Sequence, residues 1–140
     1  MKTSSSLPYD PSLTPLHIAA IEGNIDTLKT LIKVKNEDPN KSQINTGMAA
    51  IHFASHQGQL NIVRYLCENT PVDPQCTTVE GLTPMHLAAK QGKLDVIRYL
   101  VEQQNADTSV RDVQCWKPLD YAIVMGQRVV DQYLLSVKSK

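Results

Sequence analysis

The segment Thr83-Pro84-Met85-His86-Leu87-Ala88-Ala89 decides the fold of this 140-residue chain, because three further versions of it recur at a nearly constant spacing. The other versions begin at Thr14, Ala49 and Lys117, so successive copies are offset by 35, 34 and 34 residues. Each copy is followed three residues later by a glycine: Gly23, Gly58, Gly92 and Gly126. A fixed period of this length indicates a repeat architecture, in which one supersecondary unit stacks on the next.

Within each copy, the residue types predict a first helix that begins near the proline and ends at the glycine. Thr14 and Thr83 precede the proline, where a hydroxyl can cap the helix and the missing proline N–H is no loss. The small pairs Ala19-Ala20 and Ala88-Ala89 allow neighbouring helices to approach closely. The glycine tolerates the positive φ that commonly ends a helix. Beyond each glycine, apolar residues at helical spacing predict a second helix, as in Val96-Ile97-Leu100-Val101.

This pattern resembles the ankyrin-repeat family, whose Thr-Pro-Leu-His-x-Ala-Ala signature recurs at a period of about 33 residues. The resemblance covers residues 9–137 and implies an all-α solenoid of stacked antiparallel helix pairs with short hairpin-like loops. We therefore expect one domain, with a flexible leader at 1–8 and a polar tail at 138–140. The predicted repeats are 9–43, 44–77, 78–111 and 112–137. Polar residues in the first and last repeats predict that their outer faces are exposed to solvent. We therefore expect the stack of repeats to be complete or nearly so.

The composition excludes several classes of partner. Hydrophobic residues make up 41% of the chain and charged residues 20%, which is typical of a soluble globular protein. The 14 basic residues balance the 14 acidic ones, so the simplest argument for a nucleic-acid partner is absent. No apolar run approaches the ~20 residues that span a bilayer, and we expect no membrane insertion. Three cysteines without a Cys-x-x-Cys pair or a visible secretory signal favour free thiols. We expect an intracellular, cytoplasmic monomer, with a nuclear location left open.

No constellation of residues predicts catalysis, a metal or a cofactor. His17, His52 and His86 lie one repeat apart, about 10 Å in a helical stack, which is too far to share a metal ion. The resemblance implies that their rings hydrogen-bond neighbouring backbone and the motif threonine. The sequence contains no glycine-rich phosphate loop and no paired-carboxylate motif. A basic row on the second helices (Lys29, Arg64 and Arg98) is interpreted as a solvated face, because glutamates follow two of its members four residues later.

The resemblance implies that a protein partner binds the concave side, which the hairpin tips and the exposed flanks of the first helices form. The predicted partner-binding residues at the tips are Leu13, Met48, Leu82 and Trp116. Those on the flanks are Ile21, His56, Gln57, Lys90, Gln91, Val124 and Met125. Aromatic and methionine side chains are enriched at the centres of interfaces. The alternative is that the four apolar tip residues pack on one another along the stack.

The last repeat departs furthest from its neighbours at these positions. Trp116, Val124 and Met125 are apolar, whereas the inner repeats carry His56-Gln57 and Lys90-Gln91 on the same flank. Together they predict an anchor for an apolar group of a partner. Two alternatives remain open: Trp116 covers Val124, or another repeat of a longer protein stacks there.

Two functions from different classes follow from the resemblance. The first is a non-enzymatic adaptor or scaffold that recruits a protein partner. The second is a small stoichiometric inhibitor or regulator of an enzyme such as a kinase, or of a cytoskeletal factor. The second rests on the similar size of free-standing proteins in the family, which is an analogy and not a property of a site.

Overall fold

The computed structural model describes residues 12–138, which form eight helices and their connecting loops, with no strand in that range. The helices are α1 (Pro15–Glu22), α2 (Ile25–Lys33), α3 (Ala50–Gln57), α4 (Leu60–Asn69), α5 (Pro84–Gln91), α6 (Leu94–Glu102), α7 (Pro118–Val124) and α8 (Arg128–Lys138). The predicted all-α solenoid is therefore confirmed. The predicted leader lies outside the described residues, and α8 extends one residue into the predicted tail.

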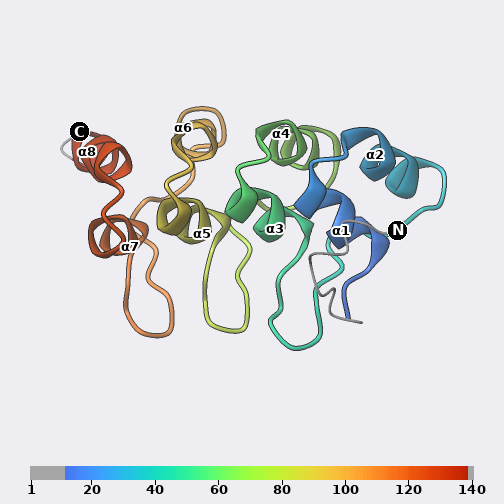
Figure 1. The fold of residues 1–140 in the computed structure, drawn as a ribbon, viewed down its shortest axis with the longest axis horizontal. Coiled ribbons are helices and arrows are strands. Elements are labelled where there is room, and N and C mark those ends of the chain that lie inside the picture. The colour runs from blue at the N-terminus through green and yellow to red at the C-terminus, as the bar shows by residue number, and fades with distance from the viewer. Residues whose placement is uncertain (1–11, 139–140) are drawn as a thin grey trace.

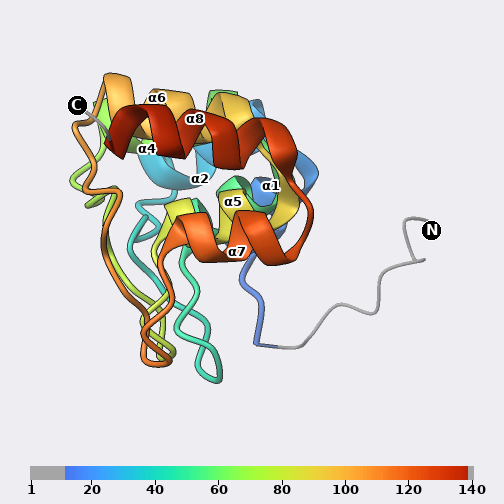
Figure 2. The same ribbon diagram turned by 90° about the vertical axis from the view of Figure 1, so that its left-hand side faces the viewer.

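The helices lie in two layers (Figure 1). An inner layer contains α1, α3, α5 and α7, and an outer layer contains α2, α4, α6 and α8. Each inner helix packs against the inner helices of the adjacent repeats and against the outer helix of its own repeat. The long hairpin loops between repeats project to one side of the molecule, beyond the inner layer (Figure 2).

The ends of the inner helices form as the motif predicts. The Thr14 and Thr83 hydroxyls accept hydrogen bonds from the backbone N–H three residues later, at 3.2 and 3.3 Å. The first three inner helices end at Gly23, Gly58 and Gly92, whose φ values are +77°, +76° and +72°. Helix α7 ends one residue earlier in its repeat, and its glycine still has a positive φ.

The motif alanines lie at the centre of the stack. Ala19 is 3% exposed, and Ala54, Ala88 and Ala122 are completely buried, which confirms their predicted packing. Large aliphatic residues of the outer helices, such as Ile97, fill the space between the two layers. Close packing of this kind leaves little room for a change in side-chain volume.

The motif histidines link each of the first three repeats to the loop that follows. In each ring Nδ1 accepts a hydrogen bond from the backbone N–H three residues earlier, so Nε2 carries the proton in the neutral ring. That Nε2–H donates to a backbone carbonyl: His17 to Lys41 (2.7 Å), His52 to Cys76 (2.9 Å) and His86 to Trp116 (2.9 Å). Burial lowers the pKa of all three rings, and that of His52 falls to about 4.

The hairpins are held together by backbone hydrogen bonds between adjacent repeats. The Val79 N–H donates to the Thr46 carbonyl, and the Val113 N–H donates to the Glu80 carbonyl, both at 3.0 Å. The approach is so close at Gly81 that a Cβ there would lie 3.0 Å from the Val113 nitrogen. The hairpins therefore stack in register with the helices.

Candidate partner-binding groove

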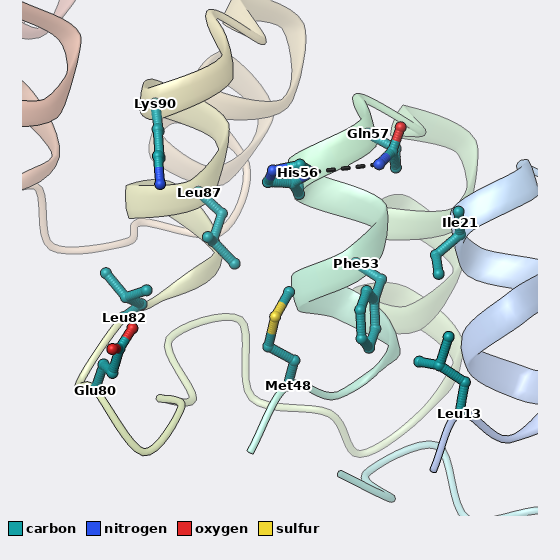
Figure 3. Close-up of a pocket in the computed structure, with 10 residues that line it drawn as sticks. All are labelled: Leu13, Ile21, Met48, Phe53, His56, Gln57, Glu80, Leu82, Leu87 and Lys90. Atoms are coloured by element: carbon teal, nitrogen blue, oxygen red, sulfur yellow. Dashed lines mark hydrogen bonds between the residues drawn. The ribbon is translucent and has the colours of Figure 1, made fainter. Parts of the chain in front are cut away.

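A groove of about 470 Å³ opens between the hairpins and the inner helices of the first three repeats (Figure 3). Its walls come from α1, α3 and α5 and from the loop residues that precede these helices. The residues that line it are Leu13, Ile21, Met48, Phe53, His56, Gln57, Glu80, Leu82, Leu87 and Lys90. Most of this surface is apolar, which is typical of a site for apolar side chains of a partner.

Seven of the eleven residues predicted to bind a partner meet in this groove. They are Leu13, Ile21, Met48, His56, Gln57, Leu82 and Lys90, and they come from three different repeats. The repeat period places equivalent positions on one side of the stack, so residues up to 77 positions apart line one cavity. Gln91 is half-buried and does not line the groove.

The hairpin residues differ from the prediction in one respect. Met48, Leu82 and Trp116 are half-buried and lie just past the chain reversal, where their carbonyls accept hydrogen bonds from the opposite side of the hairpin at 2.9–3.0 Å. The reversals themselves expose Ile44, Val79 and Val113, which are 84%, 63% and 68% exposed. Of the predicted tip residues, Leu13, Met48 and Leu82 therefore form part of the groove wall, and a second apolar row occupies the tips.

The rim of the groove is polar and charged. His56 is half-buried, and the Gln57 side-chain amide donates a hydrogen bond to its Nδ1 at 3.3 Å. Burial lowers the pKa of His56, and the nearby cations Lys90 and Lys93 lower it further. Glu80, on the hairpin side, brings a negative charge to the opposite part of the lining.

Three lining residues were missed by sequence reasoning. Phe53 and Leu87 occupy the variable position between the motif histidine and alanine, and Glu80 lies in a hairpin. The helical period contained a usable signal for Phe53, because it lies three residues before His56 and therefore on the same helix face. Its ring packs 5.3 Å from that of His17, centroid to centroid.

The three C-terminal residues lie outside the groove. Trp116 packs against Tyr121, with the ring centroids 4.9 Å apart, and it is half-buried. Val124 and Met125 are 64% and 48% exposed. The structure thus brings Trp116 onto Tyr121, and it leaves Val124 and Met125 exposed at the end of α7.

Cys67 and Cys76 are poorly suited to nucleophilic chemistry. All three are free, and burial raises the pKa of Cys67 to about 12 and that of Cys76 to about 11. A thiol is nucleophilic only as the thiolate, which a raised pKa disfavours at neutral pH. His52, whose Nε2 lies 4.0 Å from the Cys76 sulfur, already donates to a carbonyl. Within residues 12–138 no group of three or more His, Cys, Asp and Glu side chains could hold a metal ion.

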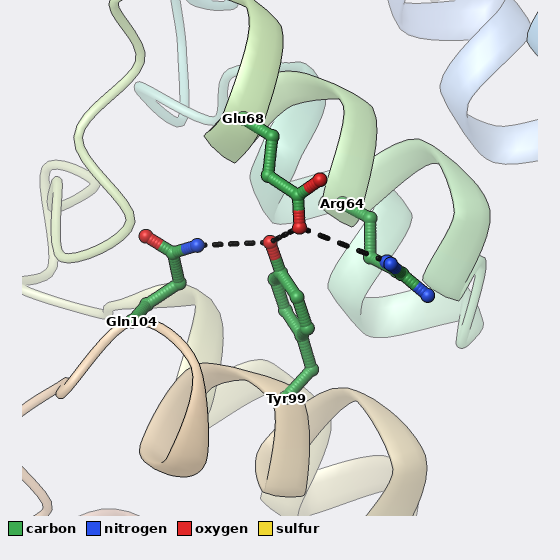
Figure 4. A network of polar contacts seen from close by, with 4 residues as sticks. All are labelled: Arg64, Glu68, Tyr99 and Gln104. Atoms are coloured by element: carbon green, nitrogen blue, oxygen red, sulfur yellow. Dashed lines mark hydrogen bonds and ion pairs between the residues drawn. The ribbon is translucent and has the colours of Figure 1, made fainter.

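The basic row on the outer helices is more than a solvated face. The expected pairs within a helix are present, between Arg64 and Glu68 (3.8 Å) and between Arg98 and Glu102 (3.4 Å). In addition, Glu68 accepts a hydrogen bond from the Tyr99 hydroxyl of the next repeat at 2.6 Å (Figure 4). The glutamate that pairs with Arg64 therefore also connects neighbouring repeats.

Stacked helix pairs with a laterally open groove define a helical-repeat solenoid, a class of protein-binding scaffold. The family model described as "Ankyrin repeats (3 copies)" matches residues 4–77, and one described as "Ankyrin repeats (many copies)" matches residues 68–122. The chain belongs to the ankyrin-repeat family. Membership of this family indicates a protein-binding module rather than a catalytic domain.

A solved structure supports the same fold. A chain in the crystal structure of the yeast ribosomal protein Rps3 in complex with its chaperone Yar1 matches with a TM-score of 0.79 and 24% sequence identity. The match covers 86% of this chain and 89% of that chain. No curated protein matches the sequence. Of the helices between residues 12 and 138, none has the length and apolar character needed to cross a membrane.

Proposed function

We propose that this protein is a non-enzymatic adaptor that binds a protein partner through the groove on its concave face. The observation that carries the proposal is the convergence of seven predicted residues from three repeats on one apolar cavity of about 470 Å³. The apolar lining is surrounded by His56, Gln57, Glu80 and Lys90, an arrangement typical of an interface with an apolar centre and a polar rim. In this proposal Gln91 extends the rim beyond Lys90.

The proposal includes a location and an assembly state. Three free cysteines fit a reducing compartment, so we place the protein in the cytoplasm. We propose that it is a monomer, because the groove is already formed by the repeats of a single chain.

The test compares a groove variant with a matched surface variant. Met48→Glu places a charge in the apolar lining, whereas Val129→Glu makes a similar change on the outer helix α8, where Val129 is 63% exposed. Proteins captured from cells by the wild-type chain are quantified by mass spectrometry and compared with those captured by each variant. We expect Met48→Glu to lose the partner and Val129→Glu to retain it. Equal capture by both variants would contradict the proposal.

The second contact region in this proposal consists of Trp116, Val124 and Met125. The exposure of the two helical residues supports it, and the packing of Trp116 on Tyr121 leaves the indole only half-buried. Val124→Glu tests the region in the same capture experiment. A partner that binds the groove alone would be retained by this variant, and the second region would then be rejected.

The adaptor and the stoichiometric inhibitor differ in what they capture. An adaptor brings down at least two partners in one complex. An inhibitor brings down one enzyme at a fixed ratio and suppresses its activity. Size-exclusion chromatography of the captured complex, followed by an activity assay of the partner, separates these two outcomes.

A further inference from the structure

The same contact between a tyrosine and a glutamate recurs where neighbouring outer helices meet. The Tyr99 hydroxyl donates to Glu68 of the preceding repeat, and the Tyr133 hydroxyl donates to Glu102, each at 2.6 Å. In both places an arginine on the same helix as the glutamate, Arg64 or Arg98, pairs with its carboxylate. A carboxylate is therefore held between a phenol and a cation at two successive interfaces.

The interface between the first two repeats has the phenol and the cations but no carboxylate at this position. Tyr65 is the equivalent of the two tyrosines, and Lys33 occupies the position of the two glutamates. Tyr65 is only 8% exposed, and its hydroxyl oxygen is buried without a hydrogen-bond partner within the described part of the chain. A buried hydroxyl without a partner is unfavourable, because it loses the hydrogen bonds that water would supply.

Two ammonium groups lie beside this hydroxyl-bearing ring. The Nζ atoms of Lys29 and Lys33 are 5.6 and 6.0 Å from the centroid of the Tyr65 ring. Arg64 lies over the next tyrosine ring at a similar distance of 5.7 Å, so Lys29 corresponds to the arginine that pairs with the carboxylate there. An ammonium group offers only hydrogen-bond donors, and a phenol readily donates, so the site favours an oxygen acceptor with negative charge.

We propose that the Tyr65 site, formed by Lys29, Lys33 and Tyr65, binds an acidic side chain of a partner protein. The partner's carboxylate takes the position that Glu68 occupies in the next interface. It accepts the Tyr65 hydroxyl and pairs with the two lysines. Both lysines are exposed, so their flexible side chains can move aside to admit it. The site lies on the outer helices α2 and α4, whereas the groove is lined by the inner helices and hairpins.

The first test supplies the carboxylate from within the chain. Lys33→Glu recreates the sequence of the later interfaces, and we expect the melting temperature of the full chain to rise by about 3–5 °C. Lys35→Glu makes the same change in charge at an exposed position beyond the end of α2 and is expected to give no rise. An unchanged or lower melting temperature of Lys33→Glu relative to Lys35→Glu would overturn the geometry on which the proposal depends.

The second test measures binding with a short poly-glutamate peptide at low ionic strength. Ring signals of ¹³C-labelled tyrosine report on each phenol, and Tyr65→Phe identifies the Tyr65 signal. We expect a saturable shift of the Tyr65 signal that exceeds those of Tyr99 and Tyr133, whose hydroxyls already donate to glutamates. The shift should be lost in Lys33→Glu and retained in Lys35→Glu.

The same titration distinguishes a carboxylate from other anions. Inorganic phosphate at equal ionic strength is expected to shift the Tyr65 signal less than the peptide does. An equal or larger effect of phosphate would overturn the assignment to a carboxylate. Equal shifts of all five tyrosines, or a shift that persists in Lys33→Glu, would reject the Tyr65 site itself.

Discussion

The third and fourth repeats each consist of an inner and an outer helix, but they differ in the side chains that reach toward the C-terminus. Three positions that link a repeat to the next one are changed. The fourth repeat has Asp120, Ser136 and Cys115 where the third has His86, Glu102 and Gly81. Asp120 still accepts the backbone N–H of Lys117 at 2.8 Å, but a carboxylate has no N–H to donate onward.

The fourth repeat keeps a tyrosine that reaches back toward the N-terminus, and it has Gln127 where the third repeat has Lys93 and the second has Gln59. Tyr133 donates to Glu102, and the Gln127 side chain donates to the Lys90 carbonyl at 3.2 Å. Gln59 makes the equivalent bond to the Ile21 carbonyl at 3.1 Å. The links between repeats are therefore directional, because the fourth repeat changes its forward-reaching positions and keeps the backward-reaching tyrosine.

The two repeats should differ most in stability when the motif histidine His86, or its counterpart Asp120, is replaced by alanine. His86→Ala removes the hydrogen bonds that a completely buried ring makes to Thr83 and to the Trp116 carbonyl, and it should lower the free energy of unfolding by roughly 2–3 kcal/mol. Asp120→Ala removes a cap only and should cost about 1 kcal/mol. Urea denaturation of both variants checks this, and equal losses would contradict the directional picture.

Acidification should destabilise the inner repeats through their buried histidines. The pKa of His52 is about 4 in the folded chain, compared with 6.5 for an unperturbed ring, so protonation favours the unfolded state. The stability that the neutral ring provides is fully present above pH 6.5 and is lost as the pH falls toward about 4. Between pH 7 and pH 5 we expect a loss of roughly 2 kcal/mol from this residue. Urea denaturation at both pH values should show a smaller pH dependence for His52→Gln.

A β-carbon should be tolerated differently at two glycines that share a positive φ. At Gly81 it would lie 3.0 Å from the Val113 nitrogen, so Gly81→Ala should cost about 2 kcal/mol through strain and displacement of the adjacent hairpin. At Gly126 no heavy atom lies within 4 Å, and Gly126→Ala should cost about 1 kcal/mol from the backbone conformation alone. Thermal unfolding should rank the two variants in this order.

The smallest expected effect is a gain at the start of α7. Thr83 caps α5 by accepting the His86 N–H at 3.3 Å, whereas Lys117 has no side-chain acceptor for the equivalent bond. Lys117→Thr should therefore raise the free energy of unfolding by about 0.5–1 kcal/mol. Lys117→Val, which is β-branched but cannot accept a hydrogen bond, is the matched control and should give no such gain.

The repeat period explains why so much of the fold was predictable. Four registered copies place the capping threonines, the helix-ending glycines and the buried alanines, and these positions were found as expected. The same register brings Met48 and Leu82 to one cavity. The repeat boundaries, including the start at residue 9, stay predictions, because residues 1–11 lie outside the described part of the chain.

The features that escaped sequence reasoning depend on geometry between repeats. Ile44 and Val79 recur at the repeat spacing, but helical periodicity does not specify which hairpin residue is exposed at a reversal. The contact of Tyr99 with Glu68 joins two helices whose separation the sequence pattern does not give. Charge patterning identified the Arg64 pair within one helix, since that pair requires only a spacing of four residues.

The links between repeats also determine how the chain should open. The side-chain hydrogen bonds that join repeats connect residues 24 to 38 positions apart, so each repeat is held only by its immediate neighbours. Such a molecule behaves as a one-dimensional array, in which a unit with neighbours on both sides is held more firmly than one at an end. When the 140-residue chain is studied by itself, amide hydrogen exchange should accordingly be slower in α3 to α6 than in α1 and α8.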